Sequence, residues 1–224
     1  MRKIVIAIDG PAAAGKSTVA KRVAQILGFT YIDTGAMYRA VTYYCLKNGI
    51  DCEKEEMVDK IIDKIDIVLF PDHTVTLNGE DVTYDIRTTS VADNVSYIAS
   101  YKNVRLFLVE QQRKIAENTS VVMDGRDIGS YVLPNADVKI FQIASVETRA
   151  KRRYLENIQK GIDCTLESVT AELKKRDYID SHRDFAPLTK ADDAVALDTS
   201  YMNIEEVVSS ILEIIKQKVG DVNA

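Results

Sequence analysis

The chain has 224 residues, of which 46% are hydrophobic, and carries a formal net charge of −5 at pH 7. This length and composition allow one domain with a buried core and, at most, a small insertion. The negative charge argues against a general nucleic-acid-binding protein, because phosphate backbones require a basic surface.

Apolar runs and amphipathic stretches alternate along most of the chain. The apolar runs predict five short strands, at residues 4–8, 31–32, 121–123, 138–143 and 194–197. The amphipathic stretches predict six helices, at residues 17–27, 37–48, 104–117, 146–160, 166–180 and 204–219. This alternation is typical of a doubly wound α/β fold, a parallel sheet covered on both faces. We therefore expect one such domain over residues 1–224.

The first strand leads directly into a phosphate-binding motif. Residues 10–18 read Gly-Pro-Ala-Ala-Ala-Gly-Lys-Ser-Thr, which matches the P-loop pattern G-x-x-x-x-G-K-[ST] between a strand and a helix. Glycines let successive backbone amides curl around phosphate oxygens. We expect Lys16 to reach the β- and γ-phosphates and the Ser17 hydroxyl to bind Mg²⁺. The expected ATP-binding residues are Gly10, Pro11, Ala12, Ala13, Ala14, Gly15, Lys16, Ser17 and Thr18.

A polar string, Asp-Thr-Gly-Ala-Met-Tyr-Arg, follows the second predicted strand. Because the carboxyl ends of parallel strands line the ligand crevice, Asp33, Thr34 and Arg39 are expected to face the triphosphate site. Taken alone, the string is equally consistent with a helix N-cap followed by a solvated arginine.

Residues 65–99 interrupt the alternation of strands and helices. Extended runs at 65–70 and 74–77 flank a Pro-Asp turn, and Asn78-Gly79 then gives a hairpin signal. We expect a small antiparallel insertion that folds against the parallel core without independent stability.

A third polar string, Asp-Gly-Arg-Asp-Ile-Gly, begins at Asp124 after an apolar run. An acid in this position resembles the Walker B residue that lies near Mg²⁺ or its waters. We expect Asp33 and Asp124 to hold the metal through water, with Arg126 and Asp127 in the same crevice. A simple turn residue is the alternative for Asp124.

Two arginine-rich helices are predicted near the C-terminal end of the chain. Spacings of three and four residues place Arg149, Arg152 and Arg153 on one face. Because a phosphate site lies nearby in the expected fold, residues 149–165 are expected to form a lid over the phosphates. A solvated surface is the alternative interpretation. Arg176, Asp180 and Arg183 share a side of the next helix, before Pro187, and can stabilise charge during phosphoryl transfer.

Together these strings resemble the bacterial cytidylate kinases, the (d)CMP kinase branch of the nucleoside monophosphate kinases. The resemblance runs from residue 4 to the last predicted helix and also rests on Arg-Asp-x-x-Asp-Ser-x-Arg at residues 176–183. It implies a P-loop NTPase fold in which the insertion is the monophosphate-binding subdomain. It further implies Mg²⁺-dependent transfer from ATP to CMP or dCMP, without a phospho-enzyme.

The resemblance also implies individual roles. Arg39 and Arg126 would hold the CMP phosphate, and Arg176 and Asp180 the ribose, with Ser96 nearby. The implied substrate-binding residues are Thr34, Tyr38, Arg39, Ser96, Arg105, Arg126, Asp127, Arg176, Asp180 and Arg183. The implied catalytic residues are Lys16, Arg126, Arg152 and Arg153. Thr34 stands where relatives often carry Ser, which keeps the hydroxyl.

Cytosine fits the residues that the resemblance places around it. Asp127 and the Thr34 hydroxyl can accept from the amino group, whereas Arg105 and Arg183 can donate to N3 and O2. Uracil would instead place its O4 against a carboxylate, so we expect it to be rejected.

Three other P-loop classes fit the sequence less well. A regulatory GTPase would read guanine with a motif such as Thr189-Lys190-Ala191-Asp192, but no apolar strand precedes this string. A kinase for another small molecule, such as shikimate, would not need the insertion or the Arg-Asp string. A P-loop motor or nucleic-acid machine would need more length and a basic face.

The cysteines bear on the compartment. Cys45, Cys52 and Cys164 are odd in number and lack metal-type spacing, which favours a reduced, cytoplasmic chain. The apolar run after residues 1–3 is too short for a signal peptide or a membrane span. The expected partners are ATP and (d)CMP, with no nucleic acid and no membrane, and the expected state is a monomer.

Overall fold

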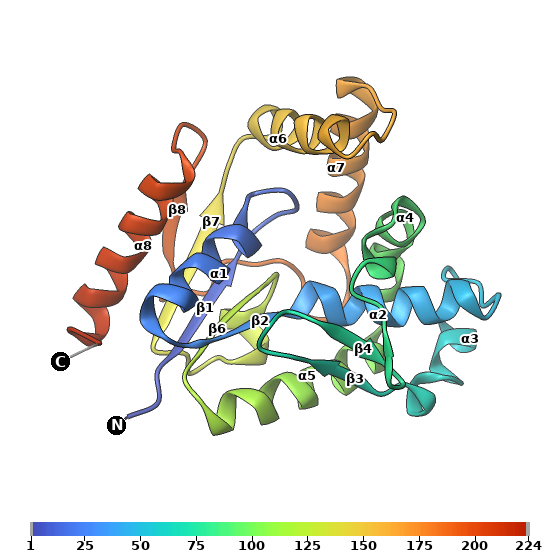
Figure 1. Ribbon diagram of the computed structural model, residues 1–224, viewed down its shortest axis with the longest axis horizontal. Helices are drawn as coiled ribbons and strands as arrows, with labels where there is room; N and C mark the ends of the chain where they lie inside the picture. The colour runs from blue at the N-terminus through green and yellow to red at the C-terminus, as the bar shows by residue number, and fades with distance from the viewer. Residues whose placement is uncertain (1, 223–224) are drawn as a thin grey trace.

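The computed structural model describes residues 2–222, and its central element is a five-stranded parallel sheet in the order β2-β6-β1-β7-β8 (Figure 1). The strands are β1 (Val5–Asp9), β2 (Thr30–Asp33), β6 (Val121–Gly125), β7 (Val138–Ile143) and β8 (Val195–Asp198). All neighbours pair in parallel. The inner strands are almost continuously apolar because helices cover both faces. The doubly wound sheet predicted from the sequence is confirmed.

Side chains of β1 alternate between two layers of helices. Ile6 and Ile8 pack with α1 (Lys16–Leu27) and α8 (Ile204–Val219) on one face. Ala7 faces the opposite layer, which includes α5 (Lys102–Asn118). β1 is therefore held in place from both sides, and its carboxyl end delivers the P-loop.

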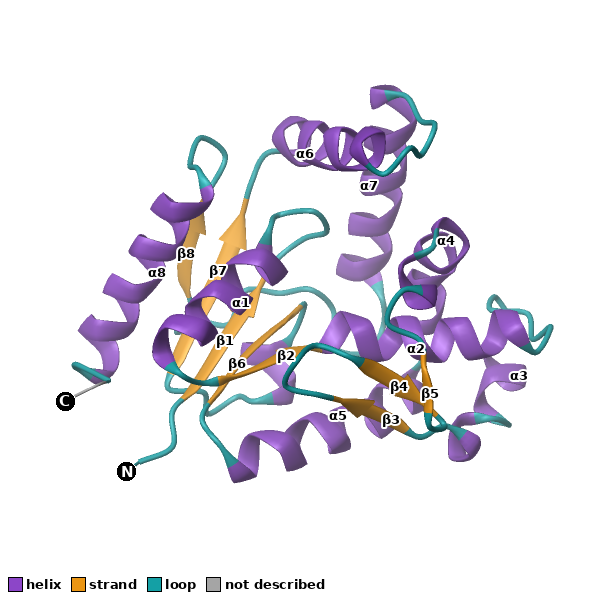
Figure 2. Cartoon of the chain, viewed as in Figure 1, coloured by secondary structure: helices purple, strands orange, loops and turns teal. Residues whose placement is uncertain are grey.

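A second hydrophobic core lies beside the sheet. It joins α2 (Thr34–Lys47), α3 (Glu55–Asp59), α4 (Thr89–Ile98) and α5 to a three-stranded antiparallel sheet (Figure 2). The strands of this sheet are β3 (Ile67–Leu69), β4 (Val75–Leu77) and β5 (Glu80–Asp81). Short 3₁₀ turns occur at Ile62–Lys64 and Asp85–Arg87. The insertion thus shares its core with α2 and α5.

The predicted hairpin is present, and its turn explains why. Asn78 and Gly79 have φ values of 50° and 83°, as a two-residue turn between right-twisted strands requires. The Asn78 side chain also accepts from the Asp66 amide at 2.7 Å and donates to the Lys64 carbonyl at 3.0 Å. The turn is therefore fixed by local chemistry.

Two capped helices follow β7. α6 (Val146–Gln159) begins at Ser145, whose hydroxyl accepts from the Thr148 amide, and α7 (Leu166–His182) begins with a capping box at Thr165. The two helices pack together, and Ala150 of α6 and Leu173 of α7 share a hydrophobic cluster with Ala12 of the P-loop. Both helices therefore rest on the phosphate-binding loop.

Most element boundaries shift by one or two residues from the prediction, and three differences have a clear local cause or are new. α2 begins three residues early, because the Asp33 carboxylate accepts from the Ala36 amide and caps the helix. α7 ends at His182, since Arg183 already has extended backbone angles, so Pro187 lies beyond the helix. A π-helical turn at Ile128–Val132 has no sequence signal. Within residues 2–222, no helix combines the length and apolarity needed to cross a bilayer.

Candidate active site

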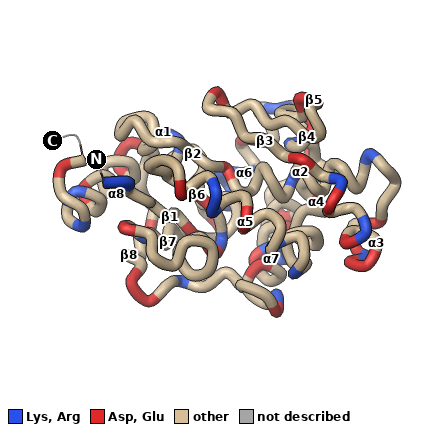
Figure 3. The backbone as a smooth tube through the Cα atoms, turned by 90° about the horizontal axis from the view of Figure 1, so that it is seen from below, with Lys and Arg blue, Asp and Glu red and all other residues tan. Residues whose placement is uncertain are grey.

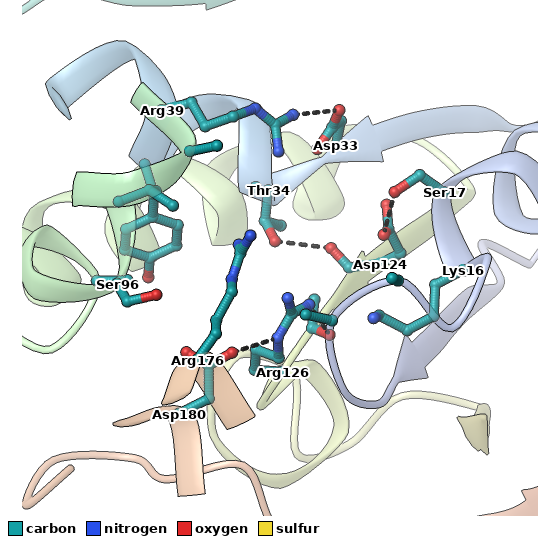
Figure 4. Close-up of a pocket in the computed structure, with 18 of the residues that line it drawn as sticks. Lys16, Ser17, Asp33, Thr34, Arg39, Ser96, Asp124, Arg126, Arg176 and Asp180 are labelled. Atoms are coloured by element: carbon teal, nitrogen blue, oxygen red, sulfur yellow. Dashed lines mark hydrogen bonds and ion pairs between the residues drawn. The ribbon is translucent and has the colours of Figure 1, made fainter. Parts of the chain in front are cut away.

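A cavity of about 340 Å³ opens where the carboxyl ends of β2 and β6 meet the P-loop (Figure 4). It is also lined from α2, α4, α5 and α7. All ten expected substrate-binding residues line this one cavity, as do P-loop residues 12–18 and both proposed metal-binding acids, Asp33 and Asp124.

The P-loop has the backbone shape that its glycines permit. Gly10 has φ 151°, and a Cβ there would lie 2.0 Å from the Gln142 carbonyl oxygen. Gly15 has φ 87° and caps α1, so the first amides of the helix are directed at the loop. The buried Lys16 ammonium donates to the Pro11 carbonyl at 2.7 Å. Burial and the nearby Arg126 charge lower the pKa of Lys16.

Asp124 is the best-connected acid of the site. Its carboxylate accepts from the Ser17 hydroxyl at 2.8 Å and from the Tyr31 hydroxyl at 2.8 Å. Burial, reinforced by the negative charge of Asp33, raises the pKa of Asp124. The P-loop serine and the Walker B-like acid are therefore in direct contact.

Asp33 is already engaged by two arginines. It accepts from Arg39 at 3.0 Å and lies 3.6 Å from Arg87, besides capping α2. Burial raises the pKa of Asp33, but the charges of Arg39 and Arg87 outweigh it, so the pKa falls below its ordinary value. Arg87 comes from the insertion and was not predicted from the sequence.

Asp127 closes the far end of the cavity between two arginines. Arg105 donates to it at 2.5 Å and Arg183 at 3.2 Å. All three side chains are buried, and the Arg105 guanidinium lies 5.4 Å from the centre of the Tyr38 ring. This pairing keeps a carboxylate and two guanidinium groups in fixed orientations.

The middle of the cavity concentrates positive charge. In Figure 4, the side chains of Arg39, Arg126 and Arg176 surround the same open centre. Arg126 donates to Asp180 at 2.8 Å, whereas the buried Nε atoms of Arg39 and Arg176 have no partner. Burial and the neighbouring Arg126 lower the pKa of Arg176 to about 10. Three guanidinium groups so close together form an anion site.

The three arginines of α6 do not act as one face, which corrects the sequence prediction. Arg149 is buried and bonds Asp177 at 2.7 Å and the Ala12 carbonyl at 3.0 Å. Arg152 donates to the Thr199 carbonyl at 2.8 Å, outside the main cavity. Only Arg153 lines that cavity, where it lies 3.4 Å from Glu156. Long side chains at neighbouring helix positions reach different partners, so spacing alone did not decide their direction.

Arg152 instead lines a separate cavity of about 580 Å³ on the other side of the P-loop. Its lining includes Ala14 and Gln142, together with Thr199 and Met202 from the loop before α8. The Gln142 side chain also donates to the Ala14 carbonyl at 2.5 Å. This second cavity had no signal in the sequence.

One buried acid was also missed. The Asp9 carboxylate accepts from the amides of Ile128 and Gly129, at 2.8 Å and 2.7 Å, directly after Asp127. Burial raises the pKa of Asp9 to about 7, although these two hydrogen bonds lower it. The signal was available, because Asp9 ends an apolar run just as Asp124 does.

The P-loop amides and the guanidinium groups of Arg39, Arg126 and Arg176 line the same cavity as Asp124, so each set can bind an anion there. Two phosphate-bearing substrates bound there would lie end to end, as phosphoryl transfer requires. Charges of both signs are otherwise interspersed along the chain (Figure 3). Fold and site together define a P-loop phosphotransferase.

The family model described as Cytidylate kinase matches residues 6–217, and the chain belongs to this family. The cytidylate kinase of Ligilactobacillus salivarius (strain UCC118) is 52% identical, over 97% of this chain and 99% of that protein. The cytidylate kinases of Clostridioides difficile (strain 630) and Bacillus subtilis (strain 168) are 53% and 50% identical, over 95% and 97% of this chain and 98% of each relative.

Solved structures agree on the fold. A gluconokinase from Sinorhizobium meliloti 1021 superposes with a TM-score of 0.51 at 14% identity, covering 96% of this chain and 94% of that one. At this identity the likeness shows the fold alone, the doubly wound P-loop architecture.

Proposed function

We propose that the protein transfers the γ-phosphoryl group of ATP to CMP or dCMP, giving ADP and (d)CDP. Membership of the cytidylate kinase family supports this reaction. The observation that carries it is the Asp127 carboxylate, held by Arg105 and Arg183 at the end of an arginine-lined cavity next to the P-loop.

Asp127 and Thr34 are proposed to read the cytosine amino group. The Thr34 hydroxyl donates its proton to the Asp124 carbonyl at 2.7 Å, which leaves its oxygen to accept from the ligand. Arg105 and Arg183 hold the Asp127 carboxylate by hydrogen bonds and can donate to N3 and O2. This pattern is complementary to cytosine and mismatched to uracil.

The arginine cluster is proposed to hold the rest of CMP. Arg39 and Arg126 bind its phosphate through charge-assisted hydrogen bonds. Arg176 and Asp180 contact the ribose, with Ser96 on α4 nearby. Because the attacking oxygen belongs to CMP, no residue is needed as a nucleophile, and the protein acts by positioning and charge neutralisation.

The P-loop is proposed to hold the ATP phosphates, with Lys16 on the β- and γ-phosphates. Arg153 then faces the transferring group, whereas Arg152 belongs with the second cavity, which we assign to the adenosine. This assignment replaces the expectation that both arginines act at the reaction centre.

Mg²⁺ is proposed to bind with ATP. The available donors, the Ser17 hydroxyl and the carboxylates of Asp124 and Asp33, are the oxygen ligands that this cation prefers. Among residues 2–222, no group of three His, Cys, Asp or Glu residues could hold a metal by itself. Such a site fits a cation held mainly by nucleotide phosphates and water. When bound, Mg²⁺ neutralises the charge that develops on the phosphates.

We also propose that the enzyme is a cytoplasmic monomer. The proposal rests on the composition and on the thiols of Cys45, Cys52 and Cys164, which are free in the structure.

A substrate panel tests the proposed function. The purified protein would be assayed with ATP and Mg²⁺ against CMP, dCMP, UMP, AMP and shikimate. We expect CMP and dCMP to be phosphorylated and kcat/KM for UMP to be roughly 10²–10⁵-fold lower, because the site forms hydrogen bonds with the polar edge of the base. Equal use of UMP and CMP would contradict the cytosine-reading site, and phosphorylation of shikimate alone would contradict the reaction.

A further inference from the structure

The Tyr31 hydroxyl completes the hydrogen bonding of Asp124. Tyr31 lies on β2 beside β6, and its hydroxyl donates to Asp124 Oδ1 at 2.8 Å. The Ser17 hydroxyl donates to Asp124 Oδ2, also at 2.8 Å. Each carboxylate oxygen thus has its own donor, and together the two donors fix the rotation of the group.

The phenol ring is itself held in place. It contacts the His73 ring edge-on, with centroids 5.7 Å apart and planes at 71°. His73 lies in the turn between β3 and β4, so the contact joins the insertion to the central sheet.

We propose that Tyr31 is a positioning residue of the metal site. Its hydroxyl holds the Asp124 carboxylate in the orientation in which the acid receives hydrogen bonds from Ser17 and from water on Mg²⁺. The inference rests on the proposed function, since it assumes that Mg²⁺ binds with ATP beside Ser17 and Asp124. Residues that orient metal-binding groups typically contribute about 10–100-fold to metal affinity.

The substitution Tyr31→Phe isolates the hydroxyl, because the ring and its contact with His73 are retained. The measurement is Mn²⁺ binding to the complex of enzyme and a non-hydrolysable ATP analogue, followed by electron paramagnetic resonance without turnover. We expect Mn²⁺ to bind about 10-fold more weakly. The affinity for the analogue without metal, and the KM for CMP, should stay unchanged.

Tyr101→Phe is the matched control. The Tyr101 hydroxyl donates to the Cys52 carbonyl at 2.8 Å, so this variant loses a tyrosine hydrogen bond of the same length away from the cavity. Its Mn²⁺ affinity should equal that of the unmodified protein.

The outcomes separate this inference from the proposed function. Unchanged Mn²⁺ affinity in Tyr31→Phe, or an equal loss in Tyr101→Phe, would overturn the positioning role. Failure of the unmodified protein to bind Mn²⁺ with the analogue, or to phosphorylate CMP, would overturn the proposed function instead.

Discussion

The P-loop wall of the cavity consists of consecutive residues, 12–18, whereas the opposite wall is assembled from side chains on α2, α4, α5, α7 and the end of β6. The P-loop offers mostly backbone amides, which carry no net charge. The opposite wall offers ionised groups that neutralise one another, such as Asp127 with Arg105 and Arg183. We infer that removing the Lys16 side chain affects chemistry alone, whereas removing one member of the opposite wall also disturbs its neighbours.

Lys16→Ala should give the largest loss of turnover and directly tests the P-loop wall. The Lys16 ammonium bonds only the Pro11 carbonyl within the protein, so the fold should survive. Turnover should fall roughly 10²-fold or more, because a charge that stabilises the transferring phosphates is lost. Steady-state kinetics and thermal unfolding measure both effects. A folded variant with near-normal turnover would refute the P-loop assignment.

Asp127→Asn should change two properties of the wall opposite the P-loop, its stability and its preference for cytosine. Arg105 and Arg183 lose their buried counter-charge, so the free energy of unfolding should fall by about 3–5 kcal/mol. The amide can rotate to donate to O4 of uracil, so kcat/KM for CMP should fall and the CMP/UMP ratio should narrow. Thr34→Ser keeps the hydroxyl and is the control. An unchanged base preference in Asp127→Asn would refute cytosine reading by this residue.

Arg126→Ala tests whether the two walls of the cavity bind different substrates. We expect the affinity for CMP to fall about 10–100-fold, because a charge-assisted contact to its phosphate is lost. The affinity for an ATP analogue should barely change. Arg39→Ala should behave in the same way. Calorimetric titration with each ligand measures this, and equal losses for both ligands would mean that these arginines do not distinguish the acceptor.

Arg153→Ala and Arg152→Ala form a matched pair on α6. Arg153 lines the main cavity and Arg152 lines the second one, so the first change should lower kcat about 10-fold with little effect on binding. The second should raise the KM for ATP instead. A larger fall of kcat in Arg152→Ala would reverse this assignment.

Asp9→Asn tests stability instead of catalysis, through the pH dependence of unfolding. The pKa of Asp9 is raised from 3.8 to about 7 in the folded protein, so between these values the folded state keeps a proton that the unfolded state has lost. Its contribution to stability therefore declines as the pH rises through this window. Relative to the unmodified protein, the variant should gain about 1–3 kcal/mol between pH 5 and pH 8. Urea unfolding at each pH measures the difference in stability between the variant and the unmodified protein. A difference that does not change with pH would contradict the raised pKa of Asp9.

Local signals explain how much the sequence predicted. The five parallel strands and the Asn78-Gly79 hairpin follow from apolar runs and turn residues close together in the chain. Asp33, Thr34 and Asp124 also follow strand ends, where a parallel sheet must place them in one crevice.

Features that depend on sheet order or side-chain direction could not be predicted. Tyr31 reaches Asp124 only because β2 lies next to β6, and the two residues are 93 positions apart in the chain. Arg87 reaches Asp33 only when the insertion has folded against α2. The side chains of Arg149 and Arg152 point away from that of Arg153 because they bond Asp177 and nearby carbonyl groups.

The unpartnered guanidinium nitrogens of Arg39 and Arg176 also bear on how long each enzyme molecule survives in the cell. Positive charge gathered in a buried cluster favours unfolding until an anion joins it, and only the folded chain can offer CMP this cluster. At a CMP concentration of 100 times Kd, binding would add about 2.7 kcal/mol to the free energy of unfolding. Proteases that act on the unfolded chain would then remove the enzyme faster when its substrate is scarce. On the proposed function, bound CMP would therefore lengthen the lifetime of the folded chain.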